Sequence, residues 1–188
     1  MVLTLTGPSG TGKTSIAKRL LTELPHASLL RSYTTRDPRR TDLPGEYAYV
    51  TQDAFDGMQR EGEFEWTASL TGTWYGTRRE DLFIAIQHPM NAWISILVPE
   101  RVPNILHVAR ELRSLNNVKA FFILPPSGSV LEDRMRERGD SRDAIEKRRT
   151  ADSSWEDAAR MSGLPYVFIE DLNGPIDLKV QAIKRHLL

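Results

Sequence analysis

Hydrophobic positions along this chain follow two patterns, short continuous apolar runs and stretches with a helical period. The first apolar run, Val2 to Thr6, predicts a buried strand. Ile16 and Leu20 then begin a stripe with the 3.6-residue spacing of an amphipathic helix, which Pro25 ends. This opening predicts a strand, a loop and a helix whose apolar face lies against a sheet.

The same two patterns continue to the C-terminus. Apolar or alternating runs predict strands at 27–33, 46–50, 90–98, 118–124 and 165–169. Helical periods predict helices at 53–60, from residue 82 toward Pro89, at 100–115 and at 176–187. Alternating strands and helices in 188 residues indicate one α/β domain, a three-layer core built on a parallel sheet.

Composition narrows the class of protein. Lysine plus arginine equal aspartate plus glutamate at 25 each, so we expect no nucleic acid polymer as a partner. The longest apolar runs fall below the roughly 18 residues of a membrane span, and a strand that starts at residue 2 leaves no room for a signal peptide. The chain contains no cysteine. We therefore expect a cytoplasmic protein without a disulfide framework, a thiolate zinc site or a membrane partner.

A glycine-rich loop between the first strand and the first helix carries the clearest chemistry. Residues 7–14 read Gly-Pro-Ser-Gly-Thr-Gly-Lys-Thr, the spacing of a P-loop. Such a loop directs backbone N–H groups at a polyphosphate, and here the residues expected to hold ATP phosphates are Gly7, Ser9, Gly10, Thr11, Gly12, Lys13 and Thr14. We expect Lys13 to reach the β- and γ-phosphates and the Thr14 hydroxyl to ligate Mg²⁺.

A second basic segment follows the expected strand at 27–33. Residues 36–40 hold three arginines, beside the hydroxyls of residues 32–35 and before the turn at Pro44. Arginine forks bind phosphate in bidentate fashion, so this segment is a candidate anion clamp. A solvated basic loop explains the same residues equally well.

Five motifs in order then resemble the guanylate kinase family. They are Ser32, Thr34 to Arg39, Gly45 to Tyr47, Gly62 to Trp66, and Trp74 to Thr77. The resemblance implies a P-loop core at 1–31, 82–126 and 160–188, with an inserted nucleoside monophosphate (NMP) binding subdomain at 32–81. It implies a short lid at 127–159.

The resemblance also implies roles for single residues. Those expected at the acceptor 5′-phosphate are Ser32, Arg36, Arg39, Tyr47 and Tyr75, and those expected at guanine are Glu65 and Thr77. Arg134 would contact ATP phosphates, while Arg138 and Arg148 would join Lys13 as catalytic residues. The tyrosines could instead be packing aromatics and Glu65 an exposed strand residue. The arginines of 130–149 could instead form a solvated helix pair laced with ion pairs.

The sequence departs from the family pattern in three places. The family places two carboxylates at the end of the strand near residues 93–96, where this chain has none, and the nearest downstream is Glu100. One residue fewer than usual separates Phe64 from the Glu before Trp66, so Glu65 is expected slightly out of register. Glu170 stands where the family has an asparagine near the adenine. These departures weaken guanine selection and leave the adenine contacts open.

The predicted function is that of a transferase. It is ATP- and Mg²⁺-dependent phosphoryl transfer to a nucleoside monophosphate, most simply GMP or dGMP, with small-molecule nucleotides as partners and an undetermined oligomeric state. One alternative is a kinase of this family with another phosphorylated acceptor, such as a modified nucleotide or a ribose bisphosphate. Another is a catalytically silent module that binds phosphopeptides, which would not require Lys13, Arg138 and Arg148.

Overall fold

The computed structural model describes residues 1–40, 42–70, 72–126, 128–137, 139–170 and 174–187. The strands are β1 (Val2–Thr6), β2 (Ala27–Leu29), β3 (Ser32–Thr34), β4 (Tyr47–Tyr49), β5 (Phe64–Leu70), β6 (Thr73–Arg78), β7 (Ala92–Ile96), β8 (Val118–Ile123) and β9 (Tyr166–Ile169). The α-helices are α1 (Lys13–Glu23), α2 (Gln52–Arg60), α3 (Arg79–Gln87), α4 (Val102–Glu111), α5 (Gly128–Glu137), α6 (Arg142–Asp152), α7 (Trp155–Met161) and α8 (Ile176–Arg185). Two 3₁₀ turns are η1 (Pro99–Arg101) and η2 (Leu115–Asn117).

Five of the described strands form the core sheet, in the order β2-β7-β1-β8-β9, and every pairing in it is parallel. All five residues of the central strand β1 are buried. Parallel strands need both faces covered, which explains their nearly continuous apolar runs. This arrangement confirms the predicted α/β fold with a parallel sheet.

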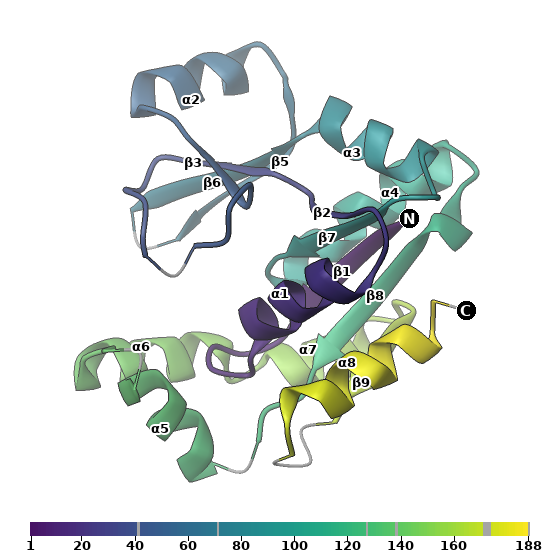
Figure 1. Cartoon of the computed structure of the whole chain (residues 1–188). Helices are drawn as coiled ribbons and strands as arrows, with labels where there is room; N and C mark the ends of the chain where they lie inside the picture. The colour runs from purple at the N-terminus through teal and green to yellow at the C-terminus, as the bar shows by residue number, and fades with distance from the viewer. Residues whose placement is uncertain (41, 71, 127, 138, 171–173, 188) are drawn as a thin grey trace.

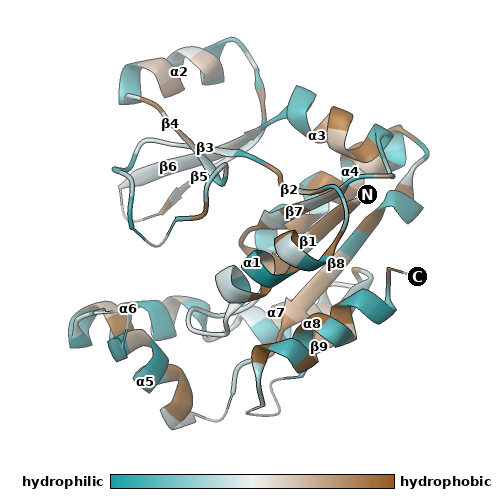
Figure 2. Cartoon of the chain, in the orientation of Figure 1, coloured by the Kyte–Doolittle hydropathy of each residue, from teal (hydrophilic) through white to brown (hydrophobic). Residues whose placement is uncertain are grey.

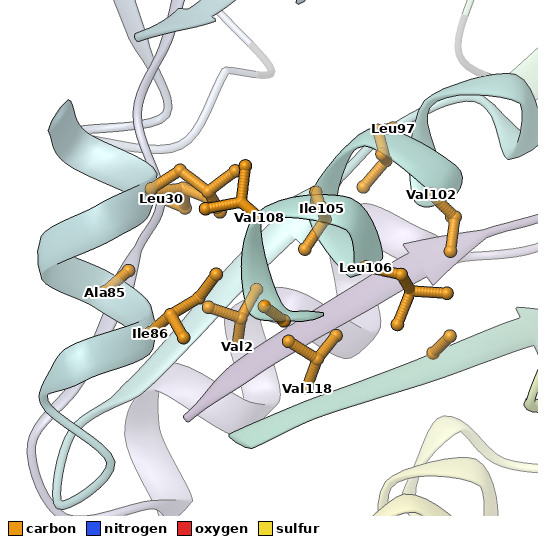
Figure 3. Close-up of a cluster of buried hydrophobic side chains, with 13 residues drawn as sticks. Val2, Leu30, Ala85, Ile86, Leu97, Val102, Ile105, Leu106, Val108 and Val118 are labelled. Atoms are coloured by element: carbon orange, nitrogen blue, oxygen red, sulfur yellow. The ribbon is translucent and has the colours of Figure 1, made fainter. Parts of the chain in front are cut away.

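Helices cover the two faces of the core sheet. On one face, α3 and α4 pack against Val2 and Val118, and Figure 3 shows their side chains meeting in one cluster. On the other face, α1 and α8 pack against Leu3 and Leu5. Successive β1 residues thus point to opposite layers, as a strand requires. Figure 2 shows the hydrophobic colour gathered on the central strands and on the helix faces turned toward them.

The predicted strand at 27–33 is two strands in different sheets. Leu29 still pairs with Ile94 in the core sheet, whereas Ser32 pairs with Tyr47 in a second sheet. The exposed Arg31 lies between them. The sequence pattern did not reveal this break, because it does not encode which strand each half pairs with.

The second sheet has the order β4-β3-β6-β5 within the described residues. One face packs on α2, where the Phe55 and Phe64 rings stack with centroids 4.6 Å apart. Position 76 on this face requires a glycine, because a Cβ there would come within 2.9 Å of the Phe64 ring. In Figure 1 this sheet lies above the carboxyl end of β1, and α5 and α6 lie below it. The start of α1 is thereby flanked on two sides.

No helix in the described part of the chain is long and apolar enough to cross a membrane.

Candidate active site

The loop between β1 and α1 depends on two of its glycines. Gly7 has φ +132°, and a Cβ there would lie 2.3 Å from the Ile123 carbonyl oxygen. Gly12 has φ +92° and precedes the first turn of α1. Only glycine adopts these conformations without strain, so the loop turns sharply where β8 passes close by. The loop therefore lies at the carboxyl end of the central strand, the usual position of ligands in such sheets.

The N-terminus of α1 is suited to an anion. Among the described residues no side chain caps this helix, and its first turn holds no acidic residue. Unpaired N–H groups and the helix dipole together favour negative charge at this end. Lys13 adds a cation, whose Nζ donates to the carbonyl oxygens of Gly7 at 2.6 Å and Pro8 at 2.8 Å. The Thr11 hydroxyl also donates to Pro8, at 2.9 Å, and braces the loop.

Two charged residues far away in the sequence support the loop. Asp152, at the end of α6 and 8% exposed, accepts a hydrogen bond from the Ser9 backbone N–H at 2.7 Å. Lys179 of α8, 4% exposed, donates to the Thr11 carbonyl at 3.4 Å. Sequence reasoning missed both. They lie 143 and 168 residues from their partners, and no local pattern distinguishes them from surface charges.

The residues at this loop fit Mg²⁺ held mainly by phosphates. Thr14 is exposed in the first turn of α1 and offers a hydroxyl oxygen. The described residues contain no group of three His, Cys, Asp or Glu side chains that could cage a metal. Mg²⁺ usually takes few protein ligands and keeps water and substrate phosphates, so this donor set is compatible with it.

The residues expected at the acceptor share one face of the second sheet. Ser32 pairs with Tyr47, and Thr34 pairs with Tyr75. Paired residues point to the same side, and so do residues two apart on one strand. Ser32, Tyr47, Tyr75 and Thr77 therefore share the face opposite α2. The Tyr47 and Tyr75 rings lie edge to face, 6.2 Å apart.

Arg36 lies beside the Tyr47 ring, and its guanidinium is held by the carboxylate of Asp42. Its two Nη atoms donate to Asp42 Oδ1 and Oδ2, each at 2.7 Å, and its Cζ lies 4.5 Å from the Tyr47 ring centroid. Burial acts to raise the pKa of Asp42, but the hydrogen bonds from Arg36 and Tyr49 outweigh it and lower that pKa to about 2. The Asp42 carboxylate thus occupies the fork that a phosphate would use.

Arg39 and Tyr47 differ in their surroundings. Arg39 is exposed, and its backbone N–H, like the Arg36 fork, donates to Asp42. The described residues supply no acceptor for the Arg39 guanidinium. Burial raises the pKa of Tyr47, and the neighbouring Glu46 raises it further. Tyr47 is therefore a neutral hydroxyl at any physiological pH.

Glu65 lies in a β-bulge, because Phe64 pairs with Arg78 while Trp66 pairs with Thr77. Its side chain, 6% exposed, pairs with Arg79 Nη1 at 2.7 Å, and Arg79 Nη2 reaches Glu111 of α4 at 2.6 Å. The shortened motif thus coincides with a shift in the pairing of β5 with β6. The cross-strand neighbour of Thr77 is Trp66, so the structure does not pair Glu65 with Thr77.

The carboxyl end of β7 carries no acidic side chain. Ser95 is buried there beside Thr4, and Glu100 is exposed in η1. Three buried polar atoms of β5, β6 and η1 have no protein partner: Trp66 Nε1, Thr77 Oγ1 and Arg101 Nε. A buried donor or acceptor without a partner costs about 1–3 kcal/mol, so these unpaired atoms lower the stability of the folded protein.

The arginines expected in the lid lie on α5 and α6. Arg134 is on α5, and Arg148 of α6 lies 3.5 Å from Asp140 Oδ2. Other arginines of the pair contact acids, such as Arg136 with Glu132. Arg138 lies outside the described residues.

Comparison with known proteins gives one consistent result. The family model described as Guanylate kinase matches residues 1–162. A guanylate kinase of Nitratidesulfovibrio vulgaris is 38% identical over 163 residues, 83% of this chain and 72% of that protein. A guanylate kinase of Nitrosospira multiformis is 34% identical over 187 residues, 96% of this chain and 81% of that protein.

A solved structure agrees on the fold. The crystal structure of guanylate kinase from Anaplasma phagocytophilum superposes with a TM-score of 0.68 at 22% identity, covering all of this chain and 84% of that one. The resemblance seen in the motifs is thus confirmed by the family model and by curated relatives. The chain belongs to the guanylate kinase family, whose members are P-loop kinases of nucleoside monophosphates.

Proposed function

We propose that this protein transfers the γ-phosphoryl group of ATP to GMP or dGMP, giving ADP and the nucleoside diphosphate. The observation that carries the proposal is the P-loop at the carboxyl end of β1, beside a second sheet that gathers an arginine and two tyrosines on one face. Donor and acceptor phosphates need two such anion sites to meet in line.

The chain's own groups act by positioning and charge. Lys13 exchanges its loop carbonyls for the β- and γ-phosphate oxygens, and the N–H groups at the start of α1 hold the donor. Ser32, Arg39, Tyr47 and Tyr75, with Arg36, hold the acceptor phosphate. The Thr14 hydroxyl would help to hold Mg²⁺, which when bound would supply further neutralisation of phosphate charge.

Residues 127–159 act as a lid in this proposal. Arg134, Arg138 and Arg148 approach the transferring group when the lid closes, and closure excludes water so that ATP is not hydrolysed. Residues 32–81 act as the NMP-binding subdomain and the rest as the P-loop core. Thr77 and Glu65 lie at the acceptor base.

A second acceptor class is a modified nucleotide or a ribose bisphosphate. The observation that favours it is the carboxyl end of β7, where Ser95 and Leu97 leave no carboxylate for the donor edge of guanine.

A coupled assay of ADP release tests the proposal. Purified protein with ATP and Mg²⁺ is offered GMP, dGMP, IMP, AMP, pyrimidine monophosphates and ribose phosphates. GMP or dGMP is expected to give the highest kcat/KM. Turnover of a ribose phosphate alone would replace the proposal with the second class, and absence of turnover with every acceptor would refute a kinase function.

A further inference from the structure

Trp66 of the second sheet is contacted by an arginine that follows the core strand β7, and a threonine is its cross-strand neighbour. Trp66 of β5 and Thr77 of β6 are cross-strand neighbours, 8% and 1% exposed. The Arg101 Cζ atom of η1 lies 5.9 Å from the Trp66 ring centroid. Trp66 Nε1, Thr77 Oγ1 and Arg101 Nε are all buried without a hydrogen-bond partner. We call these three residues the Trp66 cluster.

The position of the cluster is fixed from the core side. The η1 turn starts three residues after the end of β7, so Arg101 lies near the carboxyl edge of the core sheet that also carries the P-loop. Tyr166 donates to the Pro99 carbonyl oxygen at 3.3 Å and ties this turn to β9. From the sheet side, Thr77 shares its face with Tyr47 and Tyr75.

The charge of the cluster distinguishes it from the neighbouring ion pairs. Arg79 is saturated by Glu65 and Glu111, and Arg36 by Asp42. No carboxylate of the described residues pairs with Arg101. The cluster is therefore one of N–H and O–H donors around an unneutralised guanidinium, and its chemical complement is an edge of hydrogen-bond acceptors.

We propose that Arg101 is a specificity-determining residue that, with Trp66 and Thr77, reads the O6 and N7 acceptors of a 6-oxopurine acceptor base. This inference rests on the proposed transfer to a purine monophosphate and names how the base is selected. Arginine pairs with guanine through O6 and N7 in bidentate fashion, whereas adenine presents an N6 amino donor in place of O6. With adenine, the N–H donors of Arg101 would face the N6 amino donor, and no hydrogen bond could form there.

The cluster also predicts that the 2-amino group of guanine is not recognised. The 2-amino group of guanine needs an acceptor, and Glu65, the nearest carboxylate on β5, is already held by Arg79. GMP and IMP share O6 and N7 and differ only in that amino group. The site therefore favours both over AMP but separates them poorly from each other.

The test compares kcat/KM for GMP, IMP and AMP in the wild type, Arg101→Gln, Arg101→Lys and Arg110→Gln. Arg110 is an exposed arginine of α4 and gives the matched change of charge. In Arg101→Gln the GMP to AMP ratio should fall at least tenfold with an unchanged KM for ATP, and Arg101→Lys should lie between, because lysine keeps the charge but loses the fork. Arg110→Gln should match the wild type, in which GMP and IMP should agree within about fivefold.

Each outcome decides. Wild-type turnover of GMP with the same ratio in Arg101→Gln as in Arg110→Gln overturns this inference and leaves the proposed function intact. Absence of turnover with every purine monophosphate overturns both. A wild-type preference for GMP over IMP above about fiftyfold shows that the 2-amino group is read and overturns this reading of the site. Calorimetric binding of GMP and AMP to Arg101→Gln gives the same comparison if turnover of that variant is too slow.

Discussion

At the scale of single residues, charges near the two anion sites are already engaged with protein groups. Lys13 donates to loop carbonyls, Arg36 donates to the Asp42 carboxylate, and Asp152 accepts from the loop N–H of Ser9. Substrate phosphates must replace or share these contacts. The energetic effect of each residue therefore depends on what it leaves behind as well as on what it binds.

Replacement of Lys13 should affect the transition state most. Lys13→Ala is expected to lower kcat by at least about 100-fold, because a charge aimed at the transferring phosphates stabilises the charge that develops there. The melting temperature should stay within a few degrees of the wild type, which circular dichroism checks. A variant with near-normal turnover would contradict the kinase assignment of this loop.

Arg36 and Arg39 should separate in their effects. Arg39→Ala is expected to raise the KM of the acceptor, with ATP KM and stability unchanged, because its exposed guanidinium has no described protein acceptor. Arg36→Ala should raise the acceptor KM and also lower the melting temperature, since Asp42, 12% exposed, loses its ion-pair partner. A rise in ATP KM at constant acceptor KM would show that donor and acceptor sites are reversed.

Asp42 should make stability depend on acid. Its pKa falls from 3.8 to about 2 in the folded chain, so the native state favours the charged form. The stabilisation is complete above the unfolded pKa and is lost as pH falls from about 4 toward 2. The melting temperature of Asp42→Asn should lie below that of the wild type at pH 6, and the difference should shrink below pH 4. A constant difference across this range would count against the ion pair as its cause.

At the scale of elements, the contact between α6 and the P-loop joins the expected lid to the donor site. The carboxylate of Asp152 lies 2.7 Å from a loop N–H, where the negative phosphates of ATP would also gather. Its charge supports the loop geometry but repels the donor. The identity of this single residue thus affects how tightly ATP is bound.

Removal of that charge should strengthen ATP binding. Asp152→Asn keeps an oxygen acceptor for the Ser9 N–H, so KM for ATP is expected to fall about 3- to 10-fold, from one like-charge repulsion in a partly screened site. Asp143→Asn, an exposed change at the first turn of the same helix, is the control and should leave the constant unaltered. An increase in ATP KM would show that the carboxylate positions the loop more than it repels phosphate.

At the scale of the whole molecule, two sheets with separate cores must keep their relative position while ligands bind and leave. Arg79 joins them, since it pairs with Glu65 of the second sheet and with Glu111 of a helix that covers the core sheet. The two links differ in burial. Glu65 is 6% exposed and Glu111 is 42% exposed, so they should contribute unequally.

Loss of Arg79 should cost more than loss of Glu111. Arg79→Gln leaves Glu65 buried without its partner and is expected to destabilise the protein by about 1–2 kcal/mol, or about 2–8 °C in melting temperature. Glu111→Gln should cost less than about 0.5 kcal/mol, as exposed pairs do. Thermal unfolding of both variants, and of Arg79→Gln combined with Glu65→Gln, checks this. Failure of the double change to recover stability would mean that Glu65 is not the residue left uncompensated.

The sequence by itself determined the central strand, the loop, the first helix and the alternating α/β order. These depend on local spacing: an apolar run makes a buried strand, and glycines at fixed positions make an anion loop. The motifs through Thr77 also identified the family, since five ordered matches constrain one another. Glu65 shows the limit of local spacing, because it lies in a bulge and its carboxylate pairs with Arg79, neither of which the motif encodes.

Only the tertiary structure decided which partners meet across the chain. The run at 27–33 divides between two sheets because the hydrogen-bond partners change from β7 to β4, a change that hydrophobicity along the chain does not encode. Asp152, Lys179 and Arg101 reach their positions through packing of segments distant in sequence. Local spacing thus specifies the elements and the loop chemistry, whereas long-range packing sets which charges are paired and which remain to select a ligand.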